Sequence, residues 1–262
     1  MTTAFNTTTE TETIEHIPFE VDAGLGARAR IGLIVLATDH TVEHEFRRVV
    51  DLRDVAFYQS RIPNSPSITP ETLAAMAADI SSRAAVILPG IDLDVVAYGC
   101  TSASMVLGEE KVFELIESGR PEAKPTTPIT AAFAAFDAFD AKRIGVLTPY
   151  RRDVNERVRA YIENKGYTVP VFGSFNEEDD NIAARISPKS IKSAILKVGA
   201  RTDVDMVFLS CTSLRLVEHA AEIEAELGKP VTSSNHALAW HCLRLAGVDT
   251  VQPQFGLLYR QR

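Results

Sequence analysis

The sequence predicts an α/β protein made of two pseudo-symmetric halves, each a parallel sheet flanked by helices, with the active site in the cleft between them. Short apolar runs alternate with longer amphipathic stretches, which is typical of parallel strands covered by helices on both faces. The chain also repeats itself: Arg-Ile-Gly begins at Arg30 and again at Arg143, and Cys-Thr-Ser begins at Cys100 and again at Cys211. The offsets of 113 (143 − 30) and 111 (211 − 100) residues nearly agree, so two modules of similar size follow one another.

Strands are expected where an apolar run is short and uninterrupted, and helices where apolar residues recur at helical spacing between a capping residue and a glycine. In the first half these rules predict strands at 29–37 and 93–99, an extended segment at 49–63, and helices at 69–88 and 104–119. In the second half they predict strands at 142–149, 167–175 and 204–210, and helices at 151–166, 187–200 and 213–228.

Composition and charge narrow the class of protein. A net charge of −8 and a pI near 5.3 argue against nucleic acid and anionic membranes as partners, because both attract basic surfaces. No apolar run is long enough to span a membrane, and the polar, Thr/Glu-rich start does not resemble a signal peptide. Three cysteines in 262 residues form no disulfide framework. We therefore expect a cytoplasmic protein with free thiols.

The two Cys-Thr-Ser elements are candidates for chemistry. Each follows an apolar strand, and ligands of parallel sheets bind beyond the carboxyl ends of the strands. A helix beginning at each cysteine would lower the pKa of its thiol, while the neighbouring hydroxyls could hold a carboxylate or an enolate. Two facing thiols suit proton transfer on opposite faces of a carbon acid, or addition of a thiolate to an alkene. Neither reaction requires a metal or an organic cofactor.

Five motifs together resemble one enzyme superfamily. They are "RIGLIV", "YGCTSAS", "RIGVLTPY", "FLSCTSL" and "SSNHALAWHCLRLAGV". Over residues 28–250 the chain resembles the aspartate/glutamate racemase superfamily, and within it the branch of maleate cis–trans isomerases, arylmalonate decarboxylases and ectoine-utilisation protein A. The resemblance implies a homo-oligomer with Cys100 and Cys211 as catalytic thiols. It further implies that a substrate carboxylate is bound by Thr101, Ser102, Thr212, Ser213 and the hydroxyl of Tyr150.

The repeat and the resemblance together divide the chain. Residues 1–27 are expected to form a polar tail, residues 28–128 the first half and residues 129–229 the second half. The resemblance implies that residues 230–262 return to complete the first half.

One position departs from the family pattern. Maleate isomerases carry an asparagine after the first strand, where this chain has Asp39. An aspartate there would contact the substrate and repel a dicarboxylate. A substrate with an ammonium or amide group opposite its carboxylate fits better, and the ectoine-utilisation branch is the nearest match. Asn235 is expected to contact the substrate or to cap the last helix.

The predicted function is a cofactor-independent isomerase or racemase acting on a small carboxylate, either an amino-acid derivative or a dicarboxylate. Arylmalonate decarboxylases have glycine at the first cysteine position, so Cys100 favours this function over decarboxylation. A decarboxylase with one thiol, a cysteine hydrolase and a non-catalytic carboxylate-binding protein remain alternatives. His40 and His44 could bind zinc at helical spacing, although no metal is expected. Cys242 is expected to be a core thiol, and residues 177–180 are expected to form a solvated loop. Arg61 could steer a carboxylate or form a surface ion pair, and the resemblance makes Asn181 a candidate for the pocket.

Overall fold

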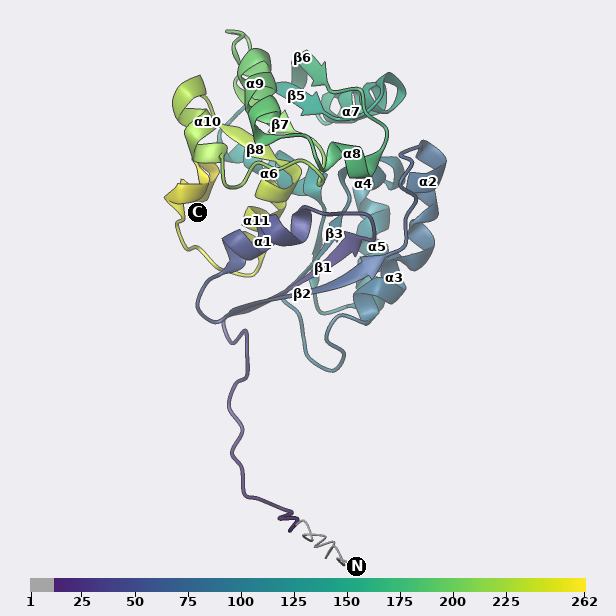
Figure 1. The fold of residues 1–262 in the computed structure, drawn as a ribbon, viewed down its shortest axis with the longest axis vertical. Helices are drawn as coiled ribbons and strands as arrows, with labels where there is room; N and C mark the ends of the chain where they lie inside the picture. The colour runs from purple at the N-terminus through teal and green to yellow at the C-terminus, as the bar shows by residue number, and fades with distance from the viewer. Residues whose placement is uncertain (1–11) are drawn as a thin grey trace, which may run out of the picture.

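The structure is a computed structural model that describes residues 12–262; residues 1–11 of the predicted tail lie outside the described residues. Residues 12–23 form no helix or strand and lead away from the folded body (Figure 1). Within the described part of the chain, no helix is long and apolar enough to cross a membrane.

Two four-stranded parallel sheets confirm the predicted fold class. The first sheet has the order β2-β1-β3-β4 and the second the order β6-β5-β7-β8, so each strand of the second sheet matches the strand four earlier. The first sheet consists of β1 (Ala29–Leu36), β2 (Val55–Ile62), β3 (Val95–Gly99) and β4 (Lys124–Thr126). The second consists of β5 (Arg143–Thr148), β6 (Thr168–Ser174), β7 (Met206–Leu209) and β8 (Val231–Ser233).

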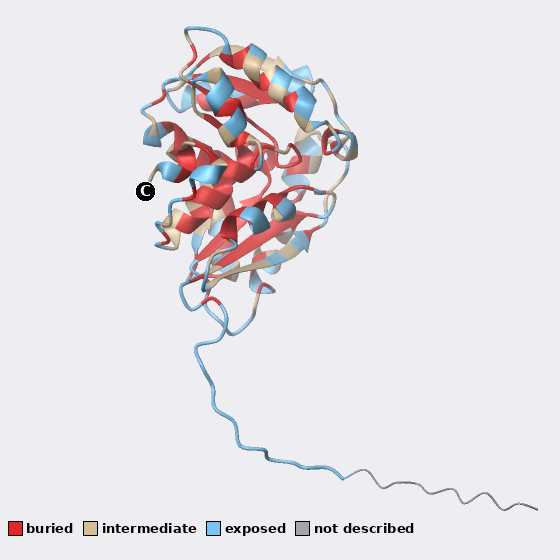
Figure 2. Cartoon of the chain, turned by 60° about the vertical axis from the view of Figure 1, so that its left-hand side comes forward, coloured by how far each residue is buried: buried red, intermediate tan, exposed pale blue. Residues whose placement is uncertain are grey.

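The helices lie against both faces of the sheets, and buried residues concentrate where sheets and helices meet (Figures 1 and 2). The first sheet is accompanied by α1 (Val42–Val50), α2 (Pro70–Ala75), α3 (Ala77–Ala85), α4 (Thr101–Leu107), α5 (Glu109–Gly119) and α6 (Pro128–Ala138). The second is accompanied by α7 (Arg152–Asn164), α8 (Asp180–Ala183), α9 (Pro188–Gly199) and α10 (Ala220–Leu227). Helix α11 (Ser234–Leu245) follows β8 and packs mainly on the first half, and 3-10 turns follow at Pro253–Phe255 and Leu258–Arg260.

The repeat extends to individual hydrogen bonds. The backbone N–H of Arg30, at the start of β1, donates to Asp94 Oδ2 at 2.7 Å. The backbone N–H of Arg143, at the start of β5, donates to Asp205 Oδ2 at 2.8 Å. Both aspartates stand at the entry to the third strand of their half, so each half aligns its first and third strands in the same way.

Helices α6 and α11 pack against each other and join the two halves. Phe136 of α6 lies edge-on to Phe208 of β7, with ring centroids 5.5 Å apart. Helix α11 packs against α1 and β3 of the first half. One core cluster therefore contains residues of both sheets, which holds the halves in a fixed relation. In the C-terminal segment 230–262, β8 joins the second sheet and α11 contacts the first half, and the division of the chain at residue 230 stays a prediction.

Three predicted helices differ from the structure. The helix predicted at 69–88 is divided at Met76 into α2 and α3, and that at 104–119 is divided at Gly108, where φ is 85°. The helix predicted from residue 213 begins only at Ala220. The preceding loop is not helical because the N–H groups of Leu216 and Val217 donate to the buried carboxylate of Glu45 instead of to carbonyls one turn earlier.

Candidate active site

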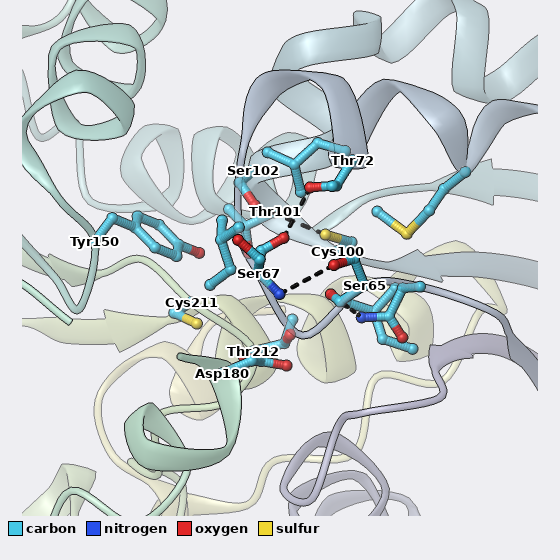
Figure 3. A pocket seen from close by; sticks show the side chains of 15 residues that line it. Ser65, Ser67, Thr72, Cys100, Thr101, Ser102, Tyr150, Asp180, Cys211 and Thr212 are labelled. Carbon is cyan, nitrogen blue, oxygen red and sulfur yellow. Dashed lines mark hydrogen bonds between the residues drawn. The ribbon is translucent and has the colours of Figure 1, made fainter. Parts of the chain in front are cut away.

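Two cysteines from equivalent positions of the two halves line one pocket. Cys100 directly follows β3 and is the N-terminal cap residue of α4. Cys211 follows β7 after Ser210. Their side chains approach the pocket from different elements (Figure 3) and are only 4% and 3% exposed. The carboxyl ends of the central strands thus bring both thiols to one site, as parallel-sheet geometry predicts.

The structure brings together six of the nine predicted site residues. These six line the pocket: Cys100, Thr101, Ser102, Tyr150, Cys211 and Thr212. Three lie outside its lining: Asp39, Ser213 and Asn235. The rest of the lining was not predicted and is formed by Leu36, Asn64, Ser65, Ser67, Ile68, Thr72, Leu73, Met76 and Asp180.

The thiols are not activated in the way the sequence predicts. Burial raises the pKa of Cys100 to about 12, although the Ala103 N–H and the Ser102 hydroxyl lower it. Burial also raises the pKa of Cys211 to about 12, and the charge of Asp180 adds to the effect. The expected lowering by helix N-termini is therefore wrong, because no helix begins at Cys211 and desolvation outweighs the short helix at Cys100. With a pKa of about 12, each thiol is protonated at pH 7.

Tyr150 places a hydroxyl beside the second thiol. Its ring is 3% exposed, and its hydroxyl contacts Cys211 and Ser102. Two hydrogen bonds fix the backbone of Tyr150. Its N–H donates to Thr148 Oγ1 at 3.2 Å, and the Tyr150 carbonyl accepts from Asn155 Nδ2 at 2.7 Å. This loop after β5 thus holds a phenol donor between the two Cys-Thr-Ser elements.

Asp39 lies behind the pocket wall and caps a helix. Its Oδ1 accepts the N–H groups of Thr41 and Val42, both at 2.7 Å, at the start of α1. Burial raises the pKa of Asp39 to about 6, against these hydrogen bonds and the nearby Thr212 side chain, which lower it. The carboxyl group is thus close enough to influence the pocket without lining it.

Asn235 supports the loop that carries the second thiol. Its Nδ2 donates to the Thr212 carbonyl at 2.7 Å and to Glu45 Oε2 at 2.8 Å. The N-terminal cap of α11 is Ser233, whose side chain accepts from His236 N–H, so the expected cap role of Asn235 is wrong. Glu45 in turn accepts the loop N–H groups described above, which connects α1 of the first half to this loop.

Asp180 is the ionisable residue among the nine lining residues that the sequence does not predict. The run of acidic residues at 177–180 is predicted as a solvated loop, but Asp180 is only 5% exposed. Its Oδ2 accepts from Thr38 Oγ1 at 2.7 Å, and its Oδ1 from Ser213 Oγ at 2.5 Å. Ser213 therefore binds Asp180 and does not itself line the pocket. No local pattern indicates this burial, because Thr38 lies 142 residues away in the chain.

Hydroxyl residues of α2 and of the segment between β2 and α2 complete the pocket. Ser65, Ser67 and Thr72 line it from the first half, and Ser67 forms a backbone bridge with Asp179 of the second half. The Asp180 N–H donates to the Pro66 carbonyl at 3.4 Å. The two halves therefore contact each other at this pocket wall as well as through α6 and α11. The hydroxyl-rich run "NSPSIT" is the only sequence signal for this wall.

The other candidates have ordinary partners. His40 Nε2 lies 2.9 Å from Asn181 Oδ1, and His44 Nε2 lies 3.3 Å from Glu218 Oε2. Among residues 12–262 no three potential metal ligands of the His, Cys, Asp or Glu type lie together. Arg61 pairs with Glu43 at 2.8 Å and donates to carbonyls that follow β1, and Cys242 is fully buried in the core.

Two parallel-sheet halves, each presenting a cysteine at the end of its third strand, define the aspartate/glutamate racemase-like fold. A family model described as arylmalonate decarboxylase matches residues 32–259. The chain therefore belongs to the arylmalonate decarboxylase and maleate isomerase family.

Individual relatives agree over nearly the whole chain. The maleate isomerase of Nocardia farcinica is 30% identical over 246 residues, covering 88% of this chain and 96% of the relative. The maleate isomerase of Pseudomonas putida is 28% identical over 243 residues, covering 87% and 96%. Among solved structures, a cysteine-to-serine variant of the Nocardia farcinica maleate cis–trans isomerase with a covalently bound succinylcysteine intermediate has a TM-score of 0.80 and 27% identity. That match covers 89% of this chain and 99% of the other. The expected closeness to ectoine-utilisation protein A stays a prediction.

Proposed function

We propose that this protein is an isomerase or racemase that acts on a small carboxylate through the thiols of Cys100 and Cys211, without a metal or an organic cofactor. The observation that carries the proposal is that both thiols, from equivalent positions of the two halves, line one pocket with hydroxyl donors beside them. We further propose that the enzyme works in the cytoplasm as a homo-oligomer.

Racemisation or epimerisation would use one thiolate and one thiol, so one of the two neutral thiols first releases its proton to solvent. The thiolate takes the proton from the carbon beside the carboxylate and becomes a thiol, while the electron pair passes into the enediolate. The second thiol then gives its proton to the opposite face and becomes the thiolate, so the pair has exchanged roles. Among the pocket hydroxyls, that of Ser102 would donate to the carboxylate or enediolate oxygens, whereas the Thr101 hydroxyl already donates to Ser234 Oγ at 2.7 Å.

Cis–trans isomerisation would use one thiolate as a nucleophile. A carbon–sulfur bond forms at one alkene carbon, and the alkene electron pair moves to the other carbon, where the adjacent carboxylate stabilises it. After rotation about the resulting single bond, the pair re-forms the alkene and the thiolate leaves. The covalent succinylcysteine in the Nocardia farcinica relative supports this route for the present chain.

The experiment that tests the proposal is proton NMR in D2O with the full chain. The panel contains maleate, a set of chiral amino and N-acetylamino carboxylates, and phenylmalonate. Deuterium incorporation at the α-carbon supports racemisation, and conversion of maleate to fumarate supports cis–trans isomerisation. Loss of carbon dioxide from phenylmalonate alone supports the decarboxylase alternative, which the arylmalonate decarboxylase family model keeps in view. If the protein converts none of these compounds, the proposal is contradicted.

A matched control separates catalytic thiols from a structural one. Cys242 is the third cysteine of the chain, fully buried in α11 and outside the pocket. The Cys242→Ala variant is expected to retain the activity of the wild type, because its sulfur contacts core side chains only.

A further inference from the structure

The pocket contains a buried carboxylate and no positively charged lining residue. Asp180 lines it, and among the described residues the lining includes no lysine or arginine. Asp180 also takes part in no ion pair within residues 12–262: its hydrogen-bond donors are the neutral hydroxyls of Thr38 and Ser213. Hydroxyl donors orient a carboxylate without neutralising it, so its negative charge acts on whatever enters the pocket.

A second carboxylate stands on the same side. Asp39 Oδ1 accepts two N–H groups at the start of α1, whereas the buried Oδ2 has no partner at full hydrogen-bond geometry among the described residues. Among side chains, only that of Thr212 is near enough to lower the pKa of the group. The side chain of Asp39 contacts Thr212, which lines the pocket. A buried carboxylate oxygen without a donor is costly unless another group supplies one. Oδ2 therefore keeps acceptor capacity for a further donor at this side of the pocket.

The pocket is chemically asymmetric. Asp180 and Thr212 lie at one side in Figure 3, whereas Ser102 and Thr72 lie at the other. The second side offers the Ser102 hydroxyl as a neutral donor for a carboxylate, while the Thr72 hydroxyl donates to the Ser67 carbonyl at 2.8 Å. One side thus suits an anion and the other repels it.

We propose that Asp180, with Asp39 behind it, forms an ammonium-binding subsite, so that the substrate carries an ammonium group at the end opposite its reacting carboxylate. The inference rests on the proposed function and adds the class of substrate. An ammonium group has three donors, and Asp180 has acceptor positions left beside the two hydroxyls it already binds. A dicarboxylate would instead place two like charges together inside a buried site.

The same subsite would prepare the second thiol for reaction. The negative charge of Asp180 is one of the causes that raise the pKa of Cys211. A bound ammonium group would offset this charge, so the thiolate becomes more accessible when the correct substrate is present. Asp180 would then act as a specificity residue that also couples binding to thiol activation.

Binding of two unreactive compounds tests the inference directly. 4-Aminobutanoate carries a carboxylate and an ammonium group, whereas succinate carries two carboxylates on a chain of similar length. Isothermal titration calorimetry with the wild type is expected to show 4-aminobutanoate binding at least about tenfold more tightly than succinate. In Asp180→Asn this ratio is expected to fall by about tenfold or more, because the charge is lost while one acceptor oxygen is retained.

Two further variants keep the test decisive. Asp39→Asn preserves an oxygen for capping α1 and is expected to lower the same ratio, even if Asp180→Asn disturbs folding. Glu178→Gln removes an equal charge from an exposed side chain two residues away and is expected to leave the ratio unchanged. Succinate binding at least as tightly as 4-aminobutanoate, no binding of 4-aminobutanoate, or a ratio unaffected by both aspartate variants would overturn the inference. The two-thiol proposal is tested separately by turnover, so either can fail alone.

Discussion

Glu45 connects the loop that carries Cys211 to the first half of the chain, and Glu45→Gln tests the energetics of this connection. Glu45 is 2% exposed in α1. Its Oε1 accepts the N–H groups of Leu216 at 2.6 Å and Val217 at 2.7 Å, and its Oε2 accepts from Asn235. Glutamine has nearly the same shape and keeps an oxygen for the two backbone donors, but it cannot ionise.

The expected effect depends on pH with a definite sign. Burial raises the pKa of Glu45 to about 7 from an ordinary value of 4.5, although its hydrogen bonds lower it. Because the folded-state pKa lies above the unfolded one, the stability contribution is complete below about pH 4.5 and is lost as pH rises through 7. The difference corresponds to about 3 kcal/mol in total, of which roughly 2.5 kcal/mol is lost between about pH 5 and pH 8.

Urea unfolding of both proteins measures this effect. Trp240 is the single tryptophan, is 5% exposed and lies in α11, so its fluorescence reports on the junction of the halves. The unfolding free energy of Glu45→Gln relative to the wild type is expected to rise by roughly 2.5 kcal/mol from about pH 5 to pH 8. Titrating groups that do not interact with Glu45 cancel in this difference, whereas Asp39, whose charge acts on Glu45, contributes to it. A difference that stays constant or falls over this range would refute the reasoning.

Three further predictions follow from burial and packing. The native protein without added ligand should react slowly with iodoacetamide at pH 7.5, because burial raises the pKa of Cys100 and Cys211 to about 12. All three thiols should react in urea, and rapid labelling of a thiol in the native protein would contradict this prediction. Tyr150→Phe should lower kcat by about tenfold or more with little change in Tm, because only the hydroxyl beside Cys211 is lost; unchanged kcat would exclude its role. Gly119→Ala should cost about 1–3 kcal/mol in urea unfolding, because a Cβ there would overlap the Ser81 carbonyl; an unaltered midpoint would contradict the packing.

The features that could be predicted from the sequence are those set by local patterns. The strands that begin near Arg30 and Arg143 are short apolar runs. Strands β3 and β7 are buried throughout, so their sequences lack the polar face that a surface helix would show. The repeated Cys-Thr-Ser could be placed at strand ends from the residue pattern alone, because each copy directly follows an apolar run, and parallel sheets bring those ends together.

The features that were missed depend on contacts between distant segments. Asp180 belongs to an acidic run that looks solvated, and only Thr38 and Ser213, which approach from elsewhere in the chain, make its burial possible. The loop after Cys211 has helical spacing of apolar residues, yet Glu45 from the other half takes its backbone donors. Propensity cannot reveal a competitor for a hydrogen bond that is about 170 residues away.

The central claim is that both pocket thiols act in turnover, and single serine variants test it most directly. Cys100→Ser and Cys211→Ser are compared with Cys242→Ala by proton NMR in D2O, using the substrate that the wild type converts. The two-thiol account predicts that each pocket variant loses at least about a thousandfold in kcat, whereas Cys242→Ala retains wild-type turnover. Retention of full activity by either pocket variant would contradict the account.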